Sequence, residues 1–180
     1  VAQTNVKDFD GAEKTFDRVL QIYPKYDNAY LGLASLRLER GDTVGALDRI
    51  GKCIELNANN AEAFIMRADI MIKNKSDYGK AVDDLSSAIT LRPKNADLFV
   101  NRAFLKYQLD DYFGAMSDFD YAINLDPNNV AAHLNRGLLR MEVEDNNKAI
   151  EDFSLVIDKD PSNIVAVYNR AMLYQKTRQY

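Results

Sequence analysis

The 180-residue chain contains one cysteine, one histidine and no tryptophan, and this shortage of reactive side chains limits its chemistry. A single cysteine cannot form an internal disulfide, and one histidine with one cysteine cannot build a His/Cys zinc site. The sequence has no glycine-rich phosphate-binding loop and no serine nucleophile elbow. We therefore expect these residues to have no enzyme activity, no cofactor and no metal.

Long apolar runs and a strong charge of one sign are also missing. The mixed apolar stretch at 63–66 is interrupted by Arg67 and Asp69, so it falls far short of the roughly 20 residues of a membrane span. The net charge of −4 gives no electrostatic footprint for nucleic acid or anionic lipid. With 47% hydrophobic residues, 4 prolines and 8 glycines, the composition argues against disorder and against an all-β fold. We expect a soluble protein, and cytoplasmic, periplasmic and secreted locations all fit.

An alanine recurs about every 34 residues, and several other positions keep the same spacing. The steps between successive alanines are 34, 35, 34 and 34 residues. The alanines are Ala12, Ala46, Ala81, Ala115 and Ala149. Four residues before each stands an aspartate, namely Asp8, Asp42, Asp77, Asp111 and Asp145. Four residues after each stands a large apolar residue, namely Phe16, Ile50, Leu85, Phe119 and Phe153. Twelve residues after each stands Pro24, Ala58, Pro93, Pro127 or Pro161.

These columns predict two helices in each repeat. The alanine and the apolar residue four positions later lie on one stripe of a helix, the aspartate is placed as its N-cap, and the proline ends it. A preceding helix opens after an asparagine in four repeats, at Asn60, Asn95, Asn129 and Asn163. It carries a small residue in each repeat, namely Ala34, Ala68, Ala103, Gly137 or Ala171. Small residues on both helices allow the two backbones to approach closely.

The pattern resembles the tetratricopeptide repeat, most clearly at residues 112–115 and 126–129. The resemblance implies an all-α fold, in which antiparallel helix pairs stack into a right-handed superhelical solenoid with a concave inner face. We expect one solenoid over residues 1–180, with full repeats at 27–60, 61–95, 96–129 and 130–163 and partial repeats at 1–26 and 164–180. The chain departs from the family in lacking the leading tryptophan, in having Ala58 for proline, and in one extra residue at 74–77.

Both ends of the sequence are expected to fall inside a repeat. Residues 1–7 are predicted to be the tail of a first helix, and residues 169–180 stop where a second helix should begin. No polar capping helix is visible at either end, although such helices normally keep a solenoid soluble. We therefore expect a fragment of a longer array, or ends that pair with another copy of the chain.

Four further columns predict packing and not chemistry. The single histidine, His133, shares its column with Tyr30, Phe64 and Phe99, and Cys53 shares its column with Ala88 and Ala122. An arginine column and an aspartate column occur together in three repeats, as Arg67 with Asp84, Arg102 with Asp118 and Arg136 with Asp152. In repeat 27–60 both are replaced, by Leu33 and Arg49. This co-variation favours a salt bridge inside each repeat over a clamp for an acidic partner.

The column before these arginines predicts the partner-binding face. It reads Gly32, Met66, Asn101, Asn135 and Asn169. By the resemblance, this part of the first helix lines the concave groove, and a ladder of amides there can hydrogen-bond an extended peptide backbone. The alternative is that the asparagines were simply inherited through repeat duplication. The same resemblance adds other groove-lining residues, namely Glu62, Asp69, Asp97, Phe104 and Tyr107, with Asn28 beside them.

The acidic residues in this set favour a partner with basic and apolar residues. Some family members grip acidic chaperone tails with a lysine–asparagine–arginine clamp, but the columns that contain Glu62 and Ile65 hold no lysine. The sequence therefore predicts a protein-interaction scaffold that binds an extended peptide or helix. Two alternatives stay open, a regulatory or substrate-recruiting segment of a larger enzyme or sensor, and a structural module that self-associates through its open ends.

Overall fold

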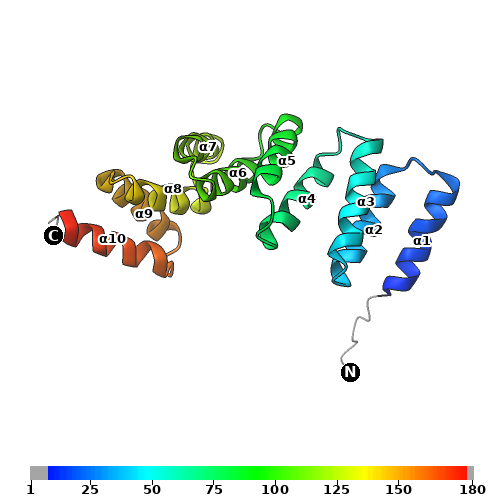
Figure 1. The fold of residues 1–180 in the computed structure, drawn as a ribbon. Helices are drawn as coiled ribbons and strands as arrows, with labels where there is room; N and C mark the ends of the chain where they lie inside the picture. Colours follow the sequence, from blue (N-terminus) through cyan, green and yellow to red (C-terminus); the bar gives the residue numbers. More distant parts are fainter. Residues whose placement is uncertain (1–7, 178–180) are drawn as a thin grey trace, which may run out of the picture. The chain divides into compact units, whose positions relative to one another are not determined.

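The structure, a computed structural model, describes residues 8–177, and all regular structure in that range is α-helical. The helices in chain order (Figure 1) are α1 (Phe9–Ile22), α2 (Asp27–Glu39), α3 (Thr43–Leu56), α4 (Ala61–Lys73), α5 (Tyr78–Leu91), α6 (Ala96–Gln108), α7 (Tyr112–Leu125), α8 (Val130–Glu142), α9 (Asn146–Lys159) and α10 (Ile164–Thr177). They confirm the predicted all-α helical repeat array. The helix tail predicted at residues 1–7 lies outside the described range, and within that range no helix is long and apolar enough to cross a membrane.

The predicted N-caps account for where most helices begin. Backbone N–H groups of the first turn donate to the side chains of Asp8, Asp42, Asp77 and Asp111, at distances of 2.8 to 3.0 Å. The asparagines Asn60, Asn95, Asn129 and Asn163 accept in the same way. Asp145 is the exception, because it precedes α9 without a capping bond and its carboxylate pairs with Lys148 at 3.0 Å. Side-chain caps of this kind satisfy backbone groups that have no partner inside the helix.

Proline marks the end of the second helix of a repeat but is not required there. α1, α5, α7 and α9 each end two residues before a proline. α3 ends at Leu56 in the same register, although Ala58 replaces the proline. A proline is therefore not required to end this helix at this position of the repeat.

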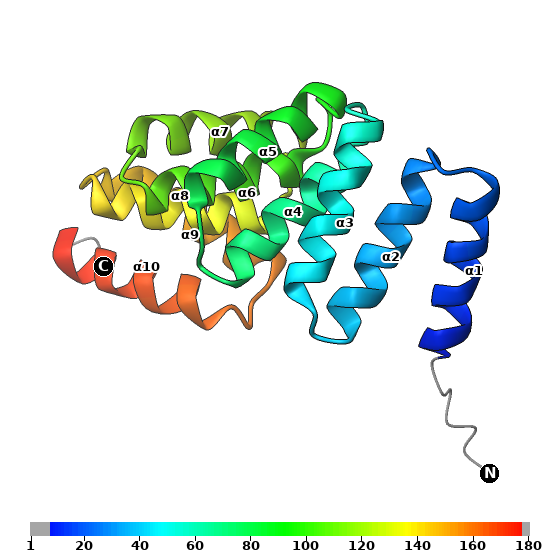
Figure 2. The same ribbon diagram turned by 45° about the vertical axis from the view of Figure 1, so that its right-hand side comes forward.

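The chain forms two compact units, residues 1–74 and residues 75–180. The first unit contains α1 to α4, and Figure 2 shows α1, α2 and α3 side by side with neighbouring helices running in opposite directions. The second unit contains α5 to α10, where α6 pairs with α7 and α8 pairs with α9. The single solenoid over residues 1–180 and its repeat boundaries stay a prediction.

Each hydrophobic core is shared between one helix pair and the next helix along the chain. In the first unit, Ala34 of α2 and Ala46 of α3 share a cluster with Ala63 of α4. In the second unit, a cluster that includes Ala103, Ala115 and Phe119 extends to Leu139 of α8. The next one joins Phe153 of α9 to Leu173 of α10. A helix pair therefore cannot bury its core alone, which makes stacking of neighbouring repeats obligatory.

Close approach of the paired helices is clearest at Gly137 of α8. A Cβ atom built there would lie 2.9 Å from a ring carbon of Phe153 in α9. Ordinary van der Waals contacts are longer, so α8 and α9 meet at a distance that excludes a larger side chain. The predicted role of the small-residue column is confirmed at this position.

Candidate functional site

In the second unit, the asparagine column lies on the first helix of each successive repeat. Asn101 belongs to α6, Asn135 to α8 and Asn169 to α10, and all three side chains are half-buried. The amide nitrogen Nδ2 of Asn135 donates to the carbonyl oxygen of Ala131 at 2.9 Å, one turn earlier in the same helix. Asn169 makes the equivalent bond to Val165, also at 2.9 Å. These bonds fix the amide orientation and leave each side-chain oxygen and one N–H available.

The first unit does not continue this amide column, because Gly32 occupies its position in α2. A Cβ atom at Gly32 would lie 2.4 Å from the ring of Phe16, which α1 places in this space. The next member, Met66 of α4, packs against the core cluster that contains Ala63. The asparagines are therefore confined to α6, α8 and α10.

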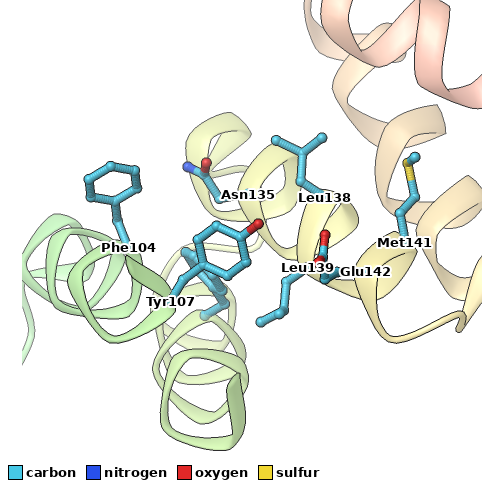
Figure 3. Close-up of a pocket in the computed structure, with 8 residues that line it drawn as sticks. Phe104, Tyr107, Asn135, Leu138, Leu139, Met141 and Glu142 are labelled. Atoms are coloured by element: carbon cyan, nitrogen blue, oxygen red, sulfur yellow. The ribbon is translucent and has the colours of Figure 1, made fainter. Parts of the chain in front are cut away.

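A cavity of about 330 Å³ opens beside this column in the second unit. Its lining side chains are Phe104, Tyr107, Phe119, Asn135, Leu138, Leu139, Met141 and Glu142. Figure 3 shows Phe104 and Tyr107 projecting from one side, while Asn135, Leu138 and Glu142 come from α8 on the other. Phe119 and Leu139 are almost fully buried, whereas Phe104 keeps 37% of its surface exposed. An apolar cavity with a few polar groups at its edge is typical of a ligand-binding site.

Three residues predicted from the sequence, Phe104, Tyr107 and Asn135, therefore meet at one cavity. Asp97 does not line it, since it lies in the first turn of α6 and accepts a 3.2 Å hydrogen bond from Nδ2 of Asn129. Asn101 of α6 and Asn169 of α10 do not line it. Their binding role, like that of the other predicted residues, stays a prediction.

Glu62 and Asp69 belong to α4 of the first unit and do not line this cavity. Part of the Asp69 side chain reaches solvent, but desolvation and the charge of Glu62 raise its pKa. The charge of Glu62 therefore acts on Asp69 within α4. Their negative charges therefore do not belong to the wall of the cavity.

The sequence interpretation did not identify five lining residues, namely Phe119, Leu138, Leu139, Met141 and Glu142. Helical spacing could have indicated two of them. Leu138 and Glu142 follow Asn135 by three and seven residues, which places them on the same face of α8. Phe119 was assigned to packing alone because it belongs to a column of large apolar residues. The structure corrects this, since Phe119 fills the core and also forms part of the cavity wall.

The arginine column holds the helices of the second unit together. Arg102 forms a two-point contact with Asp118, through Nε at 2.8 Å and Nη2 at 2.7 Å. Arg136 contacts Asp152 in the same way, at 3.0 Å and 2.7 Å. The predicted salt bridge within a repeat is therefore confirmed in repeats 96–129 and 130–163. Fork-shaped guanidinium contacts of this kind are geometrically specific and fix the register of the two helices.

Each of these arginines also reaches back to the preceding repeat, which the sequence interpretation did not anticipate. Nη1 of Arg102 donates to Ser86 in α5 at 3.0 Å, and Nη1 of Arg136 donates to Asp120 in α7 at 2.7 Å. Arg170 makes the corresponding bond to Ser154 in α9 at 3.1 Å. Arg102 and Arg136 therefore each join three helices, so their charges serve the fold and not the cavity.

His133 is buried and contributes hydrogen bonds to the helix packing. Its Nδ1 lies 2.8 Å from Oδ1 of Asp152, and its Nε2 lies 3.1 Å from the backbone oxygen of Pro127. Both ring nitrogens face groups of the protein itself. The predicted packing position is confirmed, with hydrogen bonds in addition to the packing.

Cys53 should resist alkylation in the folded protein. Burial, followed by the charge of Asp27, raises the pKa of this thiol to about 11, so very little thiolate exists at about pH 8. We expect iodoacetamide to leave the native chain unmodified at this pH and to alkylate it in urea, as measured by mass spectrometry. Rapid alkylation of the native chain would show that Cys53 is accessible and more reactive than its burial implies.

Comparison with known proteins gives matches to parts of the chain. Residues 6–70 match the family model described as tetratricopeptide repeat. A segment of 92 residues is 29% identical to the protein CTR9 homolog of Arabidopsis thaliana. This segment covers 51% of this chain and 8% of that protein. The chain thus corresponds to a small part of this curated relative.

Two solved structures share the fold. YrrB, described as a TPR protein with an unusual peptide-binding site, superposes with a TM-score of 0.80 at 21% identity, covering 92% of this chain and 85% of that chain. The first TPR of Spaghetti (RPAP3), solved with an HSP90 peptide, gives a TM-score of 0.64 at 23% identity, covering 68% and 97%.

The recurring helix pairs and their shared cores define an all-α repeat array, with a cavity lined by α6, α7 and α8. Within that class, the chain is similar to tetratricopeptide repeat proteins, because residues 6–70 match that family model and the structural neighbours share the fold.

Proposed function

We propose that this chain is a protein-interaction module that binds an extended segment of a partner protein along α6 and α8. The observation that carries this proposal is the cavity that brings Phe104, Tyr107 and Asn135 together. An apolar hollow can hold one side chain of a peptide while the amide of Asn135 bonds to its backbone. Recognition of the backbone provides affinity, and the cavity provides specificity.

The hydrogen-bonding capacity of the asparagines suits an extended backbone. Asn135 and Asn169 each use one N–H within their own helix, so the side-chain oxygen can accept a peptide N–H and the second N–H can donate to a peptide carbonyl. Both bonds are needed to satisfy the alternating donors and acceptors of an extended chain. A helical ligand has already paired most of these groups internally, so we favour an extended ligand.

The structural neighbours are consistent with peptide binding, since one is described by its peptide-binding site and the other was solved with a peptide. The peptide in the second case, SRMEEVD, carries more acidic than basic residues. In this chain the cavity wall carries Glu142 and no lysine. We therefore expect a partner segment that is less acidic than this peptide.

Replacing Asn101 and Asn135 together with alanine should weaken peptide binding about 5- to 150-fold, because the net loss at each asparagine is about 0.5–1.5 kcal/mol. Peptides are first selected by panning a displayed library of random peptides on the whole chain. Affinities of the synthetic peptides are then measured by fluorescence anisotropy. The melting temperature should change little, since both side chains are half-buried and outside the core clusters.

The matched control replaces Asn59 and Asn124, two exposed asparagines that do not line the cavity. This double variant should bind the selected peptides like the wild type. Equal affinity of the wild type and the variant lacking Asn101 and Asn135 would remove the amide column from the site. Failure to select any peptide whose binding depends on these side chains would count against the proposed function itself.

The first alternative, a regulatory or substrate-recruiting segment of a larger enzyme or sensor, places catalysis outside these residues, and the burial of His133 and Cys53 is consistent with it. Self-association gains some support from α10, where Ile164 and Tyr168 are 78% and 63% exposed. Light scattering at several protein concentrations separates a monomeric binding module from an assembly formed through this helix.

A further inference from the structure

The carboxylate at the cavity differs from those between the helices. Asp118 is neutralised by Arg102 and Lys106, with nearest nitrogen–oxygen distances of 2.7 and 2.8 Å. Glu142 lines the cavity and is exposed, and no residue in the range 8–177 forms an ion pair with it. Its negative charge is therefore available to a ligand, whereas the charge of Asp118 is already used by the fold.

A second carboxylate and two tyrosine rings accompany Glu142. The Tyr112 hydroxyl donates to Asp110 at 3.3 Å, and the ring of Tyr112 lies 5.7 Å from that of Tyr107, centroid to centroid. Desolvation raises the pKa of Tyr112, and the negative charges of Asp110 and Glu142 raise it further. Carboxylates attract cations, and so do the faces of aromatic rings.

The rest of the cavity wall is apolar. Leu138, Met141 and Phe104 surround the opening, and its volume of about 330 Å³ is near the lower limit of ligand pockets. This space suits one long side chain better than a bulky ligand. Lysine and arginine combine an aliphatic stem, which packs on apolar surface, with a charged end that needs a counter-charge or water.

We propose that this cavity binds the side chain of a lysine or arginine from an extended segment of a partner protein. The aliphatic stem packs against Leu138 and Met141, and the charged end lies at Glu142 beside the ring of Tyr107. The inference rests on the proposed function, since it identifies which residue of the bound peptide enters the cavity. An acidic side chain is repelled by Glu142, and an apolar side chain gains nothing from this carboxylate.

A double-mutant cycle tests the charge of the anchor separately from its shape. Each lysine of a selected peptide is replaced by norleucine, which keeps the stem and removes the ammonium group, and each arginine by neutral citrulline. For the anchor residue, this change should weaken binding to the wild type about three- to thirtyfold, from the combined loss of an ion pair and a cation–π contact. For the Glu142→Gln variant, the same replacement in the peptide should reduce the affinity by a factor about two- to fivefold smaller, because the counter-charge is already gone.

The control is Glu151→Gln, which makes the same charge change at an exposed position of α9 away from the cavity. It should leave the effect of norleucine or citrulline unchanged. If the neutral peptides bind the wild type as tightly as the charged ones, while the variant lacking Asn101 and Asn135 still loses binding, the anchor is apolar. The inference is then wrong and the proposed function stands. If no selected peptide depends on Asn101, Asn135 or Glu142, both are wrong.

Discussion

Replacing Asp152 with alanine should lower the free energy of unfolding by about 3–5 kcal/mol, the usual cost of removing one partner from a buried ion pair. Asp152 is only 2% exposed and accepts from three side chains, His133, Arg136 and Arg140. The alanine variant leaves these donors in a site with little water. Arg136 keeps its contact with Asp120, but Arg140 loses its closest carboxylate. The loss should therefore be among the largest for a single substitution in this chain.

Urea unfolding followed by circular dichroism measures this loss. The matched control is Asp158→Ala, on the exposed side of the same helix, which should change the stability by no more than about 0.5 kcal/mol. Asp118→Ala gives a second comparison, since Asp118 holds two cationic side chains and no histidine. A loss below about 1 kcal/mol for Asp152→Ala would mean that the network adds register but little stability.

Sequence columns predicted this network only in part. The joint replacement of arginine and aspartate in repeat 27–60 indicated a pair inside one repeat, and the structure confirms it for Arg102 and Arg136. The third bond, to Ser86 or Asp120 of the preceding helix, was not predicted. Serine and aspartate share that column, so no single residue type recurs there. The side chains in this column accept hydrogen bonds because of their position beside the arginines, and their residue type alone does not reveal this role.

The candidate site was predictable to a similar extent, for a physical reason. A column of asparagines on one helix face indicates a shared surface, and three of the predicted residues do line one cavity. A column alone cannot show whether a neighbouring side chain already fills the space, as Phe16 does at Gly32. It also cannot show which carboxylates are already paired. Asp118 and Glu142 are both acidic residues on helices around the cavity, yet only Glu142 is left without a cation among residues 8–177.

Phe119 shows why residues of the fold and residues of the site cannot be separated by columns. It is 1% exposed and belongs to the core cluster of α6, α7 and α8, but its ring also forms part of the cavity wall. Phe153 holds the same column in the next repeat, is fully buried, and does not line the cavity. The two phenylalanines therefore have equal roles in packing and different roles at the site.

Phe119→Ala and Phe153→Ala should each lower the free energy of unfolding by about 3–5 kcal/mol, the cost of removing a buried aromatic ring and leaving a void. Urea unfolding of both variants measures this loss. The milder pair Phe119→Leu and Phe153→Leu should stay folded, with losses below about 1.5 kcal/mol. Selected peptides should then bind the Phe119→Leu chain with altered affinity, because the cavity wall has changed, and the Phe153→Leu chain with unchanged affinity. Equal effects of both leucine variants on binding would mean that Phe119 acts through stability alone. The bound peptide would then contact other residues of the cavity wall, such as Leu138 and Tyr107.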